Sequence, residues 1–585
     1  MAAPLRVANC SGFYGDRFDA AREMVEGGPI DVLTGDYLAE LTMAILWRSR
    51  AKDPSRGYAS SFYRQMEEVL GRCLDRGIRV VANAGGLNPG GLAERLRDLA
   101  DDLGLELSVG VVTGDDLMGR LDDVVAAAGG DLPNLDSGRP FAEVADRVLT
   151  ANAYLGGWGI AAALDAGADV VVTGRVADAA LVAGPAAHHH GWAPDDWDAL
   201  AGAMVAGHVV ECGTQCTGGN DPAFASLPGV DHPGFPIAEV AEDGSAVITK
   251  HPGTGGAVTG ATVTAQLLYE VGGPAYATPD VVARFDTIHL EDLGDDRVRV
   301  SGVRGQPAPD TAKLGLVHLG GFRQTMTLLV PPPDVRAKAD LVEGQLRDAL
   351  GSDVRLDTEL IEGDPDAATR VGAAARFRVT ATSDDASAAG RAFSAAVVEL
   401  ALASYPGFSP TAPPGEATPF TGFWPALAPS SVAVAEVTVD GEPVDVAVPP
   451  ISPLEAPDAE PGEHLRLDDG RCCATVPLGR VVGARSGDKG ADANVGVWAH
   501  TDAAFAWLDR FLDVGRLRSL VPEIGDLAVD RHRFPNLRAL NFVVRGLLGE
   551  GGVAASTRLD PQAKTLGEFL RSREVEVPLD LLEAQ

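Results

Sequence analysis

The stretch DVLTGDYLAELTM, residues 31–43, decides how this chain is interpreted. An apolar run typical of a buried strand, Ile30–Leu33, ends shortly before Asp36, and a helical pattern follows from Leu38 to Arg50. Ligands of open α/β sheets bind at the carboxyl ends of the strands. We therefore expect the carboxylates of Asp36 and Glu40 to lie at a ligand site.

The spacing of Asp36 and Glu40 has two interpretations. Residues four apart share a face of a helix, where two carboxylates repel each other unless a cation, a shared proton or a ligand compensates. Alternatively, Asp36 caps the helix and Glu40 lies in its solvated first turn. This motif alone does not decide between the two interpretations.

Three further segments repeat the order of apolar strand, glycine-containing polar turn and helix. They are Val80–Gly91, Val109–Leu117 and Ala168–Ala180. Continuous Val runs are typical of parallel strands that are buried on both faces. Turn formation explains Gly, Asn and Asp at any one strand end, but it does not explain an arginine. We therefore predict that four strand ends line one edge of a sheet. Their polar tips are Asp36, Asn83, Asp115 and Arg175.

The alternation of strands and helices from Leu5 to Leu181 predicts an α/β fold with a doubly wound, mostly parallel sheet. From about residue 321 the pattern becomes strand–helix–strand–strand–helix–strand, which is the ferredoxin-like motif of α+β units. Its last strand is predicted at Ser431–Thr438. A stretch rich in Pro, Asp and Glu follows and is typical of a linker. A smaller set of strands and helices ends the chain.

Six segments resemble those of the acyclic terpene utilization AtuA family. They are DVLTGDYLAELTM (31–43), RVVANAGGLNPGG (79–91), VVTGDDL (111–117), GRVADAAL (174–181), GHVVECGTQCTGGN (207–220) and RSGDKGADANVGVWA (485–499). Residues from about 5 to 335 resemble the large N-terminal domain of that family, and residues from about 476 to 578 resemble its ferredoxin-like C-terminal domain. The resemblance implies a role in the breakdown of acyclic terpenoids and related branched acids, in a pathway that runs through CoA thioesters.

The predicted domain organisation combines the pattern and the resemblance. An AtuA-like α/β domain spans residues 1–320, a ferredoxin-like α+β unit 321–448, a linker 449–470 and an AtuA-like ferredoxin-fold domain 471–585. Strands of this last domain are predicted at 476–484, 493–500, 537–547 and 554–559, and helices at 503–511 and 563–571.

The C-terminal domain carries the charged and glycine-rich run Arg485–Asn494. Such a turn can hold an anion through its backbone N–H groups. It lacks the spacing of a phosphate-binding P-loop. The alternative is a solvated hairpin whose charges pair with each other. Ser486, Asp488, Lys489 and Asn494 are therefore candidates for substrate binding.

Composition excludes several classes of function. The net charge of −35 over 585 residues argues against nucleic acid or an anionic membrane as a partner. No apolar run approaches the roughly 20 residues that span a bilayer, and no signal-peptide core follows Met1, so we expect a cytoplasmic protein. The sequence has no GxGxxG after the first strand, no GxSxG and no HExxH, which argues against a dinucleotide enzyme, a serine hydrolase and a zincin.

Metal binding is also not predicted. Cys212 and Cys216 are spaced CxxxC, but the two further ligands that zinc requires are missing at a recognisable spacing. The run His188–His190 places consecutive rings in different directions, which is typical of a helix end or loop. We predict no metal and no cofactor; CoA enters only as part of a thioester substrate.

The remaining chemistry is that of carboxylates, amides and arginine. Such groups suit removal of a proton next to a thioester or carboxylate, with an amide or arginine stabilising the enolate. We predict an enzyme of the hydratase or lyase type that acts on a branched or terpenoid acyl-CoA or acid. A non-catalytic protein that binds an acyl intermediate or scaffolds an enzyme is one alternative, and a hydrolase is another.

The predicted site follows from these motifs. Asp36, Glu40 and Asp115 are the candidate acids and bases. The predicted substrate-binding residues are Asn83, Asn88, Arg175, Asp178, Glu211, Gln215, Lys250, Ser486, Asp488, Lys489 and Asn494. We also expect a homo-oligomer, because small two-layer units with exposed strand edges need protection and closed dimers are common among soluble enzymes.

Overall fold

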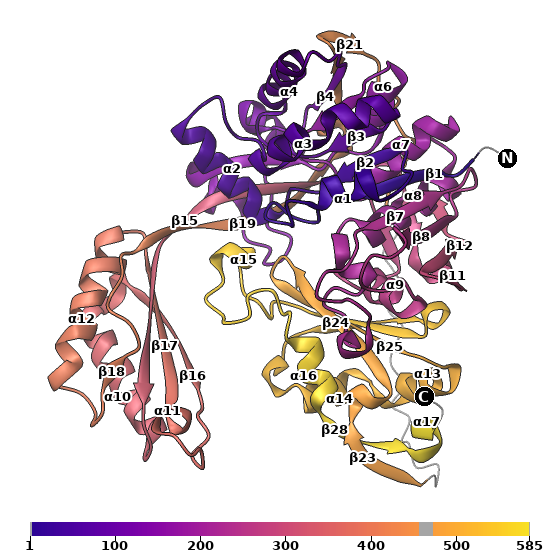
Figure 1. Ribbon diagram of the computed structural model, residues 1–585. Helices are drawn as coiled ribbons and strands as arrows, with labels where there is room; N and C mark the ends of the chain where they lie inside the picture. The colour runs from indigo at the N-terminus through magenta and orange to yellow at the C-terminus, as the bar shows by residue number, and fades with distance from the viewer. Residues whose placement is uncertain (1–2, 455–471, 584–585) are drawn as a thin grey trace. The chain divides into compact units, whose positions relative to one another are not determined.

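A computed structural model of the chain describes residues 3–454 and 472–583. The chain forms two compact units (Figure 1). The main unit comprises the described residues up to Val317, together with Trp424–Gly552 and the chain from Asp560 onward. The small unit comprises His318–Phe423 and Val553–Leu559. The residues predicted as a linker, 449–470, lie largely outside the described part of the chain.

The core of the main unit is a sheet that has eleven strands within the described residues. Its five central strands are parallel. In spatial order they are β1 (Leu5–Asn9), β2 (Val32–Gly35), β3 (Arg79–Ala82), β6 (Val170–Thr173) and β4 (Val109–Thr113). This arrangement confirms the α/β class.

Antiparallel strands extend both sides of this parallel centre. Beside β1 lie β7 (Pro236–Val240), β8 (Ala246–Lys250), β12 (Arg297–Ser301) and β11 (His289–Gly294), and beside β4 lie β20 (Glu436–Val439) and β21 (Glu442–Val444). Parallel pairing is therefore confined to the centre, where helices link the strands. The pair β7 and β8 needs only a short turn, because adjacent antiparallel strands require no crossover.

Helices cover both faces of the sheet and create two separate cores. On one face, α1 (Ala20–Gly27), α3 (Ser60–Arg76) and α4 (Pro89–Leu103) pack over Leu33 and Val80. On the other face, α6 (Trp158–Asp165), α7 (Ala180–His190) and α8 (Trp197–Val210) pack over Val32 and Val81. Neighbouring strand residues enter opposite cores because side chains alternate across a strand. This explains why the central strands carry consecutive apolar residues.

The four predicted strand-end motifs do lie at one edge of the sheet, because β2, β3, β4 and β6 are parallel and their carboxyl ends coincide. The predicted helix start is wrong by two residues. Helix α2 spans Glu40–Lys52, and residues 36–39 before it form no helix. Asp36 and Glu40 therefore do not share a helical face, and the i,i+4 argument for their proximity fails.

The small unit contains most of the predicted ferredoxin-like order. Its sheet runs β16 (Arg355–Ile361), β17 (Ala375–Ser383), β15 (Thr311–Val330) and β18 (Ser409–Pro410), with β19 (Thr418–Pro429) also pairing with β15. The helices α10 (Val335–Leu350) and α12 (Phe393–Glu399) share one apolar core with these strands. The predicted last strand, Ser431–Thr438, is wrong, since β20 pairs with β4 in the main sheet instead. The actual last strand, β19, carries six buried residues in succession, Thr421–Ala426, and so lacks a period-two pattern.

The C-terminal part of the main unit is a two-layer α+β structure, in which helices pack on an antiparallel sheet. Its antiparallel sheet has the order β24 (Val482–Lys489), β25 (Asp492–Ala499), β27 (Ala539–Val544) and β26 (Val529–Phe534). The helices α13 (Asp502–Phe511), α14 (Val514–Leu520) and α16 (Leu566–Ser572) pack on it, and β23 (Cys473–Pro477) pairs with β28 (Glu574–Pro578). The charged strand β26 was not predicted. The strand predicted at 554–559 is wrong, because α15 (Gly552–Ala555) ends within that range and residues 556–559 form no strand.

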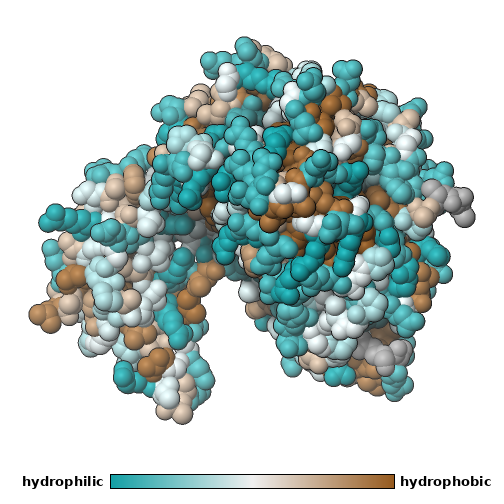
Figure 2. Space-filling model, turned by 45° about the horizontal axis from the view of Figure 1, so that its top comes forward, coloured by the Kyte–Doolittle hydropathy of each residue, from teal (hydrophilic) through white to brown (hydrophobic). Residues whose placement is uncertain are grey.

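The predicted glycine-rich turn is largely strand. Arg485–Lys489 ends β24, and only Gly490 and Ala491 form the turn into β25. Helix α9 (Gly260–Leu267) lies beside both strands of this hairpin (Figure 1). The face drawn in Figure 2 is mostly hydrophilic, with hydrophobic residues in smaller groups, as the strongly acidic composition suggests. Within the described residues, no helix has both the length and the apolar character that crossing a bilayer requires.

Candidate functional site

The turn after β2 is held by hydrogen bonds from the turn after β3. The Asp36 Oδ1 atom accepts from the Leu38 backbone N–H at 3.0 Å and from Asn83 Nδ2 at 2.6 Å. Asn83 Oδ1 accepts from the Tyr37 N–H at 2.8 Å. Burial and the charge of Asp178 raise the pKa of Asp36 well above its usual range. Asp36 is thus a positioned group that shapes the turn.

Arg175, at the end of β6, connects the other two strand ends. Its backbone N–H donates to Asp115 Oδ2 at 2.8 Å, and the same oxygen accepts from Asn152 Nδ2 at 2.8 Å. Its Nη1 atom donates to the Leu38 carbonyl at 3.0 Å and to Asp178 Oδ1 at 2.7 Å. Burial raises the pKa of Asp115 to about 6. Three of the predicted residues therefore form one connected network.

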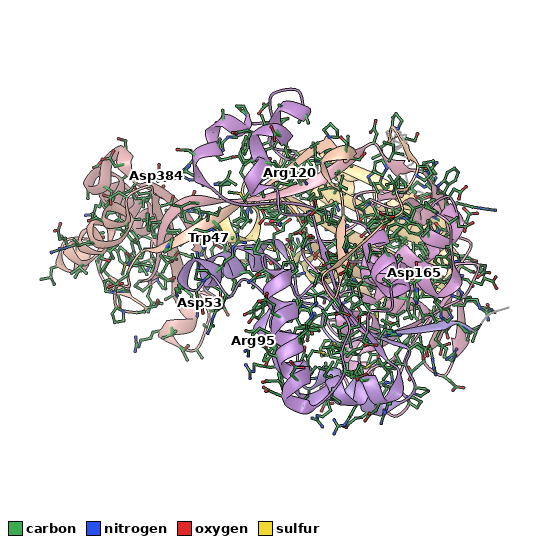
Figure 3. The ribbon with its side chains drawn as sticks, turned by 90° about the horizontal axis from the view of Figure 1, so that it is seen from above. Trp47, Asp53, Arg95, Arg120, Asp165 and Asp384 are labelled. Atoms are coloured by element: carbon green, nitrogen blue, oxygen red, sulfur yellow. The ribbon has the colours of Figure 1, made fainter. Side chains whose placement is uncertain are left out.

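A second arginine fixes the end of β4 from outside this network. Arg120, labelled in Figure 3, donates through Nη2 to the carbonyls of Gly114 at 3.2 Å and Val432 at 3.0 Å. Gly114 has a φ of 98°, a left-handed conformation that glycine adopts without strain. A Cβ there would lie 2.0 Å from the Val434 carbonyl oxygen, so the turn that presents Asp115 requires glycine.

Two cations lie on the ring of Tyr154, which follows β5 (Val148–Ala153). The Arg175 guanidinium carbon is 4.4 Å from the ring centroid, and Lys313 Nζ is 4.8 Å from it. Cations over an aromatic face are stabilised by the ring quadrupole. The tyrosine thereby holds two like charges near the strand ends, where they can meet an anionic group.

Glu40 is the first residue of α2 and is partly buried. Among the described residues, its buried Oε2 atom has no hydrogen-bond partner. Burial raises its pKa to about 7, against the opposing charge of Lys313, and the charges of Asp488 and Glu270 add to the rise. A carboxyl group that titrates near neutrality can accept or release a proton at little cost.

Glu211 caps the end of α8 and has similar features. Its Oε1 atom lies 3.1 Å from His208 Nδ1, and its side chain is 12 % exposed. Its Oε2 atom is buried without a partner among the described residues, as is Gln215 Oε1. Burial and the charges of Asp178 and Glu270 raise the pKa of Glu211 well above its usual range.

The C-terminal hairpin contributes directly to this group of charges. Lys489 Nζ donates to the Glu270 carbonyl at 3.0 Å, and Asn494 Oδ1 accepts from the Glu270 N–H at 2.8 Å. Asn494 also donates to Asn541 Oδ1, and Asn541 Nδ2 donates to the Val271 carbonyl at 2.7 Å. Glu270 has a φ of 57°, a conformation that strains a non-glycine residue. The hydrogen bond from its backbone N–H to the Asn494 side chain holds Glu270 in this conformation.

The charges of three glutamates, Glu40, Glu211 and Glu270, act on Lys489. Burial lowers its pKa, the charge of Lys313 lowers it further, and the charges of Glu270, Glu40 and Glu211 oppose this. On the same hairpin, burial and the charge of Glu270 raise the pKa of Asp488 to about 7. The strand ends of the main sheet and the hairpin therefore form one electrostatically coupled group, which we call the acid cluster. It comprises Asp36, Glu40, Arg175, Asp178, Glu211, Glu270, Lys313, Asp488 and Lys489.

Three predicted residues have other roles in the structure. Asn88 caps α4, accepting from the Gly91 N–H at 3.0 Å. Lys250 ends β8 and pairs with Asp296 at 2.8 Å. Ser486 Oγ donates to the Ala563 carbonyl at 2.6 Å and so joins β24 to the start of α16. None of these contacts involves the acid cluster.

The sequence analysis missed several members of the site. They are His208, Glu270, Tyr154, Asn152 and Lys313. Lys313 gave no signal, since an exposed charge between buried Ala312 and Leu314 is the ordinary alternation of a strand with one solvated face. His208 and Glu270 lie within helical or loop sequence without any such pattern. Within the described residues, no group of three His, Cys, Asp or Glu side chains could hold a metal ion.

Two family models match this chain, and between them they cover both parts of the acid cluster. The model described as acyclic terpene utilisation family protein AtuA matches residues 5–439, and the AtuA ferredoxin-like domain matches residues 476–576. The chain belongs to the AtuA family. The AtuA match includes the strand ends, and the ferredoxin-like match includes the hairpin. No curated protein and no solved structure matches the chain.

Proposed function

We propose that this AtuA family protein is an enzyme of acyclic terpenoid catabolism. It would act on a branched acyl substrate, as a CoA thioester or the free acid, by acid–base chemistry of the hydratase or lyase type. The observation that carries the proposal is Glu40: its buried Oε2 has no partner among the described residues, its pKa is raised to about 7, and cations lie nearby. A purely structural carboxylate would be expected to have its oxygens paired.

The roles follow from charge and position. Glu40 would remove a proton from the carbon next to the acyl carbonyl, and the electron pair of that C–H bond would move onto the carbonyl oxygen. Lys313 and Lys489, whose side chains are exposed, would stabilise the resulting negative charge, because cations positioned at a developing oxyanion lower its energy. Arg175 is engaged by Asp178 and the Leu38 carbonyl, so its part is to fix the turns.

Substitution of Glu40 by glutamine tests the proposal. Glu40→Gln keeps the size of the side chain but removes the base. If Glu40 transfers the proton, turnover of an enoyl or 3-hydroxyacyl thioester should fall about 10²-fold or more. The thermal midpoint should change little. Glu94→Gln, on the exposed face of α4, is the matched control and should leave turnover unchanged.

The products distinguish the remaining alternatives. A hydratase or lyase changes the enoyl absorbance without releasing thiol, whereas a thioester hydrolase releases free CoA. Wild-type turnover that survives in Glu40→Gln would remove Glu40 from the mechanism. Tight binding of acyl thioesters with no turnover of any would favour a non-catalytic protein that binds an acyl intermediate.

A further inference from the structure

The pair His208 and Glu211 has a hydrogen-bond geometry that fixes the position of one proton. His208 lies in the last turn of α8, is 2 % exposed, and packs against the rings of Tyr276 and Phe285, with centroids 5.2 and 5.5 Å away. Its Nε2 atom is 3.1 Å from the Gln266 carbonyl oxygen, and its Nδ1 atom is 3.1 Å from Glu211 Oε1.

The carbonyl contact determines the tautomer of the ring. A carbonyl oxygen can only accept, so Nε2 must carry a hydrogen. A neutral imidazole then has a bare lone pair at Nδ1, directly facing Glu211 Oε1. Two lone pairs at 3.1 Å would repel each other, so one proton must lie between the ring and the carboxyl group.

That proton belongs to the carboxyl group. An imidazolium would place a positive charge on a side chain that is 2 % exposed, and burial away from water disfavours that charge. The pKa of His208 is accordingly lowered to about 4 by burial, and burial together with the charges of Asp178 and Glu270 raises that of Glu211. Arg175 and Lys489 are the charges that oppose this rise.

We infer that Glu211 is a neutral carboxylic acid at neutral pH, held in that state by His208, and that it is the proton donor of the acid cluster. The donor role rests on the proposed function, whereas the protonation state does not. In the donating step the carboxyl group turns its proton from His208 Nδ1 toward an oxygen leaving the substrate, the O–H bond breaks, and the electron pair stays on the carboxylate. Arg175 and Lys489 then face the new negative charge. His208 is a positioning residue, because its polar contacts are with Glu211 and the Gln266 carbonyl and it acts on the substrate through Glu211.

With this assignment the acid cluster contains one carboxyl group that can accept a proton, Glu40, and one that can donate a proton, Glu211. Glu40 titrates near neutrality beside Lys313, whereas Glu211 holds its proton against the neutral ring of His208. Two carboxyl groups whose environments separate their protonation states are a common arrangement for acid–base catalysis. Elimination of water from a hydroxyacyl substrate needs both, one to remove the proton from carbon and one to protonate the leaving oxygen.

Infrared difference spectra test the protonation state without any substrate. The wild type minus Glu211→Gln spectrum at pH 7 should contain the carbonyl stretch of a protonated carboxyl group. In His208→Gln the new amide can donate to the carboxylate, so this band should titrate at least about one pH unit lower. His189→Gln, on the exposed end of α7, is the control and should leave the band in place. Nitrogen NMR of His208 should show a neutral Nε2–H ring at pH 7.

The outcomes separate the two claims. A carboxylate signal for Glu211, or an imidazolium signal for His208 at pH 7, would overturn the inference. If the band is present and Glu211→Gln lowers turnover about 10²-fold or more, the donor role is supported. If the band is present but that variant turns over normally, the donor role is refuted. If no acyl substrate reacts with the wild type, the proposed function fails while the protonated state of Glu211 stands.

Discussion

The acids at the strand ends differ from the acids at the helix ends. Asp36 and Asp115 each offer one oxygen to two donors. For Asp36 these are the Leu38 N–H of its own turn and Asn83 after β3, and for Asp115 they are the Arg175 N–H after β6 and Asn152 of β5. Glu40 and Glu211, at the start of α2 and the end of α8, each keep one buried oxygen without a partner among the described residues. All four lie near one edge of the sheet, and the second pair has a buried oxygen to offer a substrate.

The difference shows that hydrogen-bond saturation separates positioning groups from reactive ones. A carboxylate oxygen that accepts hydrogen bonds from two protein donors is not free to bind a substrate. Loss of that carboxylate is expected to destabilise the fold. A buried oxygen without a partner costs energy in the free protein, and a ligand that pairs with it recovers this energy. The strand-end acids should therefore affect stability most, and the helix-end acids turnover.

Arg175→Met should have the largest effect on stability. A small effect would contradict the view that the strand-end network is structural. Arg175 is buried and pairs with Asp178 at 2.7 Å. Removing one partner of a buried ion pair costs about 3–5 kcal/mol. Urea unfolding at pH 7 should show this loss, and Arg175→Lys should restore part of it. A loss below about 1 kcal/mol would show that the network is not structural.

Asp115→Asn should change how stability depends on pH. The pKa of Asp115 is raised to about 6 in the folded state, so between about pH 4 and 6 the folded protein binds this proton more tightly than the unfolded chain. Its contribution to stability is present below pH 4 and is lost as pH rises through 6. Asparagine does not titrate, so the variant does not lose stability in this way as pH rises. Relative to the wild type it should gain about 2–3 kcal/mol between pH 4 and 7.5, measured by unfolding at several pH values.

Asp280→Asn is the matched control for this prediction. Asp280 is buried, accepts from the Gly157 N–H at 2.7 Å, and has a pKa that burial raises to about 6. It should show a similar gain, although it lies outside the hydrogen bonds of Asp115. If neither variant alters the pH dependence, burial does not keep these acids neutral, and the contrast between saturated and reactive acids loses its electrostatic basis.

Asn88→Ala should have the smallest effect. Asn88 caps α4 through the Gly91 N–H, so its loss should cost about 1 kcal/mol. Turnover should be unchanged, because the side chain bonds only to its own helix and to the carbonyls of Ser55 and Arg56. A clear rise in KM with unchanged stability would instead place Asn88 at the substrate, as its motif suggested.

The sequence predicted the strand ends well because their signal is local. An apolar run that stops at a glycine and a polar residue identifies both the strand and its end, and parallel pairing then brings Asp36, Asn83, Asp115 and Arg175 to one edge. The same reasoning failed at the start of α2, because two residues of extended chain are indistinguishable from a first helical turn by periodicity. It also misplaced Ser431–Thr438, whose partner β4 is more than 300 residues earlier in the chain.

By itself, the sequence determined the α/β class, the AtuA family and the edge of the sheet where the polar groups gather, since each depends on short contiguous patterns. Only the tertiary structure decided which acids are saturated and which are not. That distinction depends on partners far apart in the chain, such as Gln266 for His208 and Lys489 for Glu270. Burial, which sets the protonation of Glu40 and Glu211, is likewise a property of the packed molecule, because neighbouring side chains and not the residue itself exclude water.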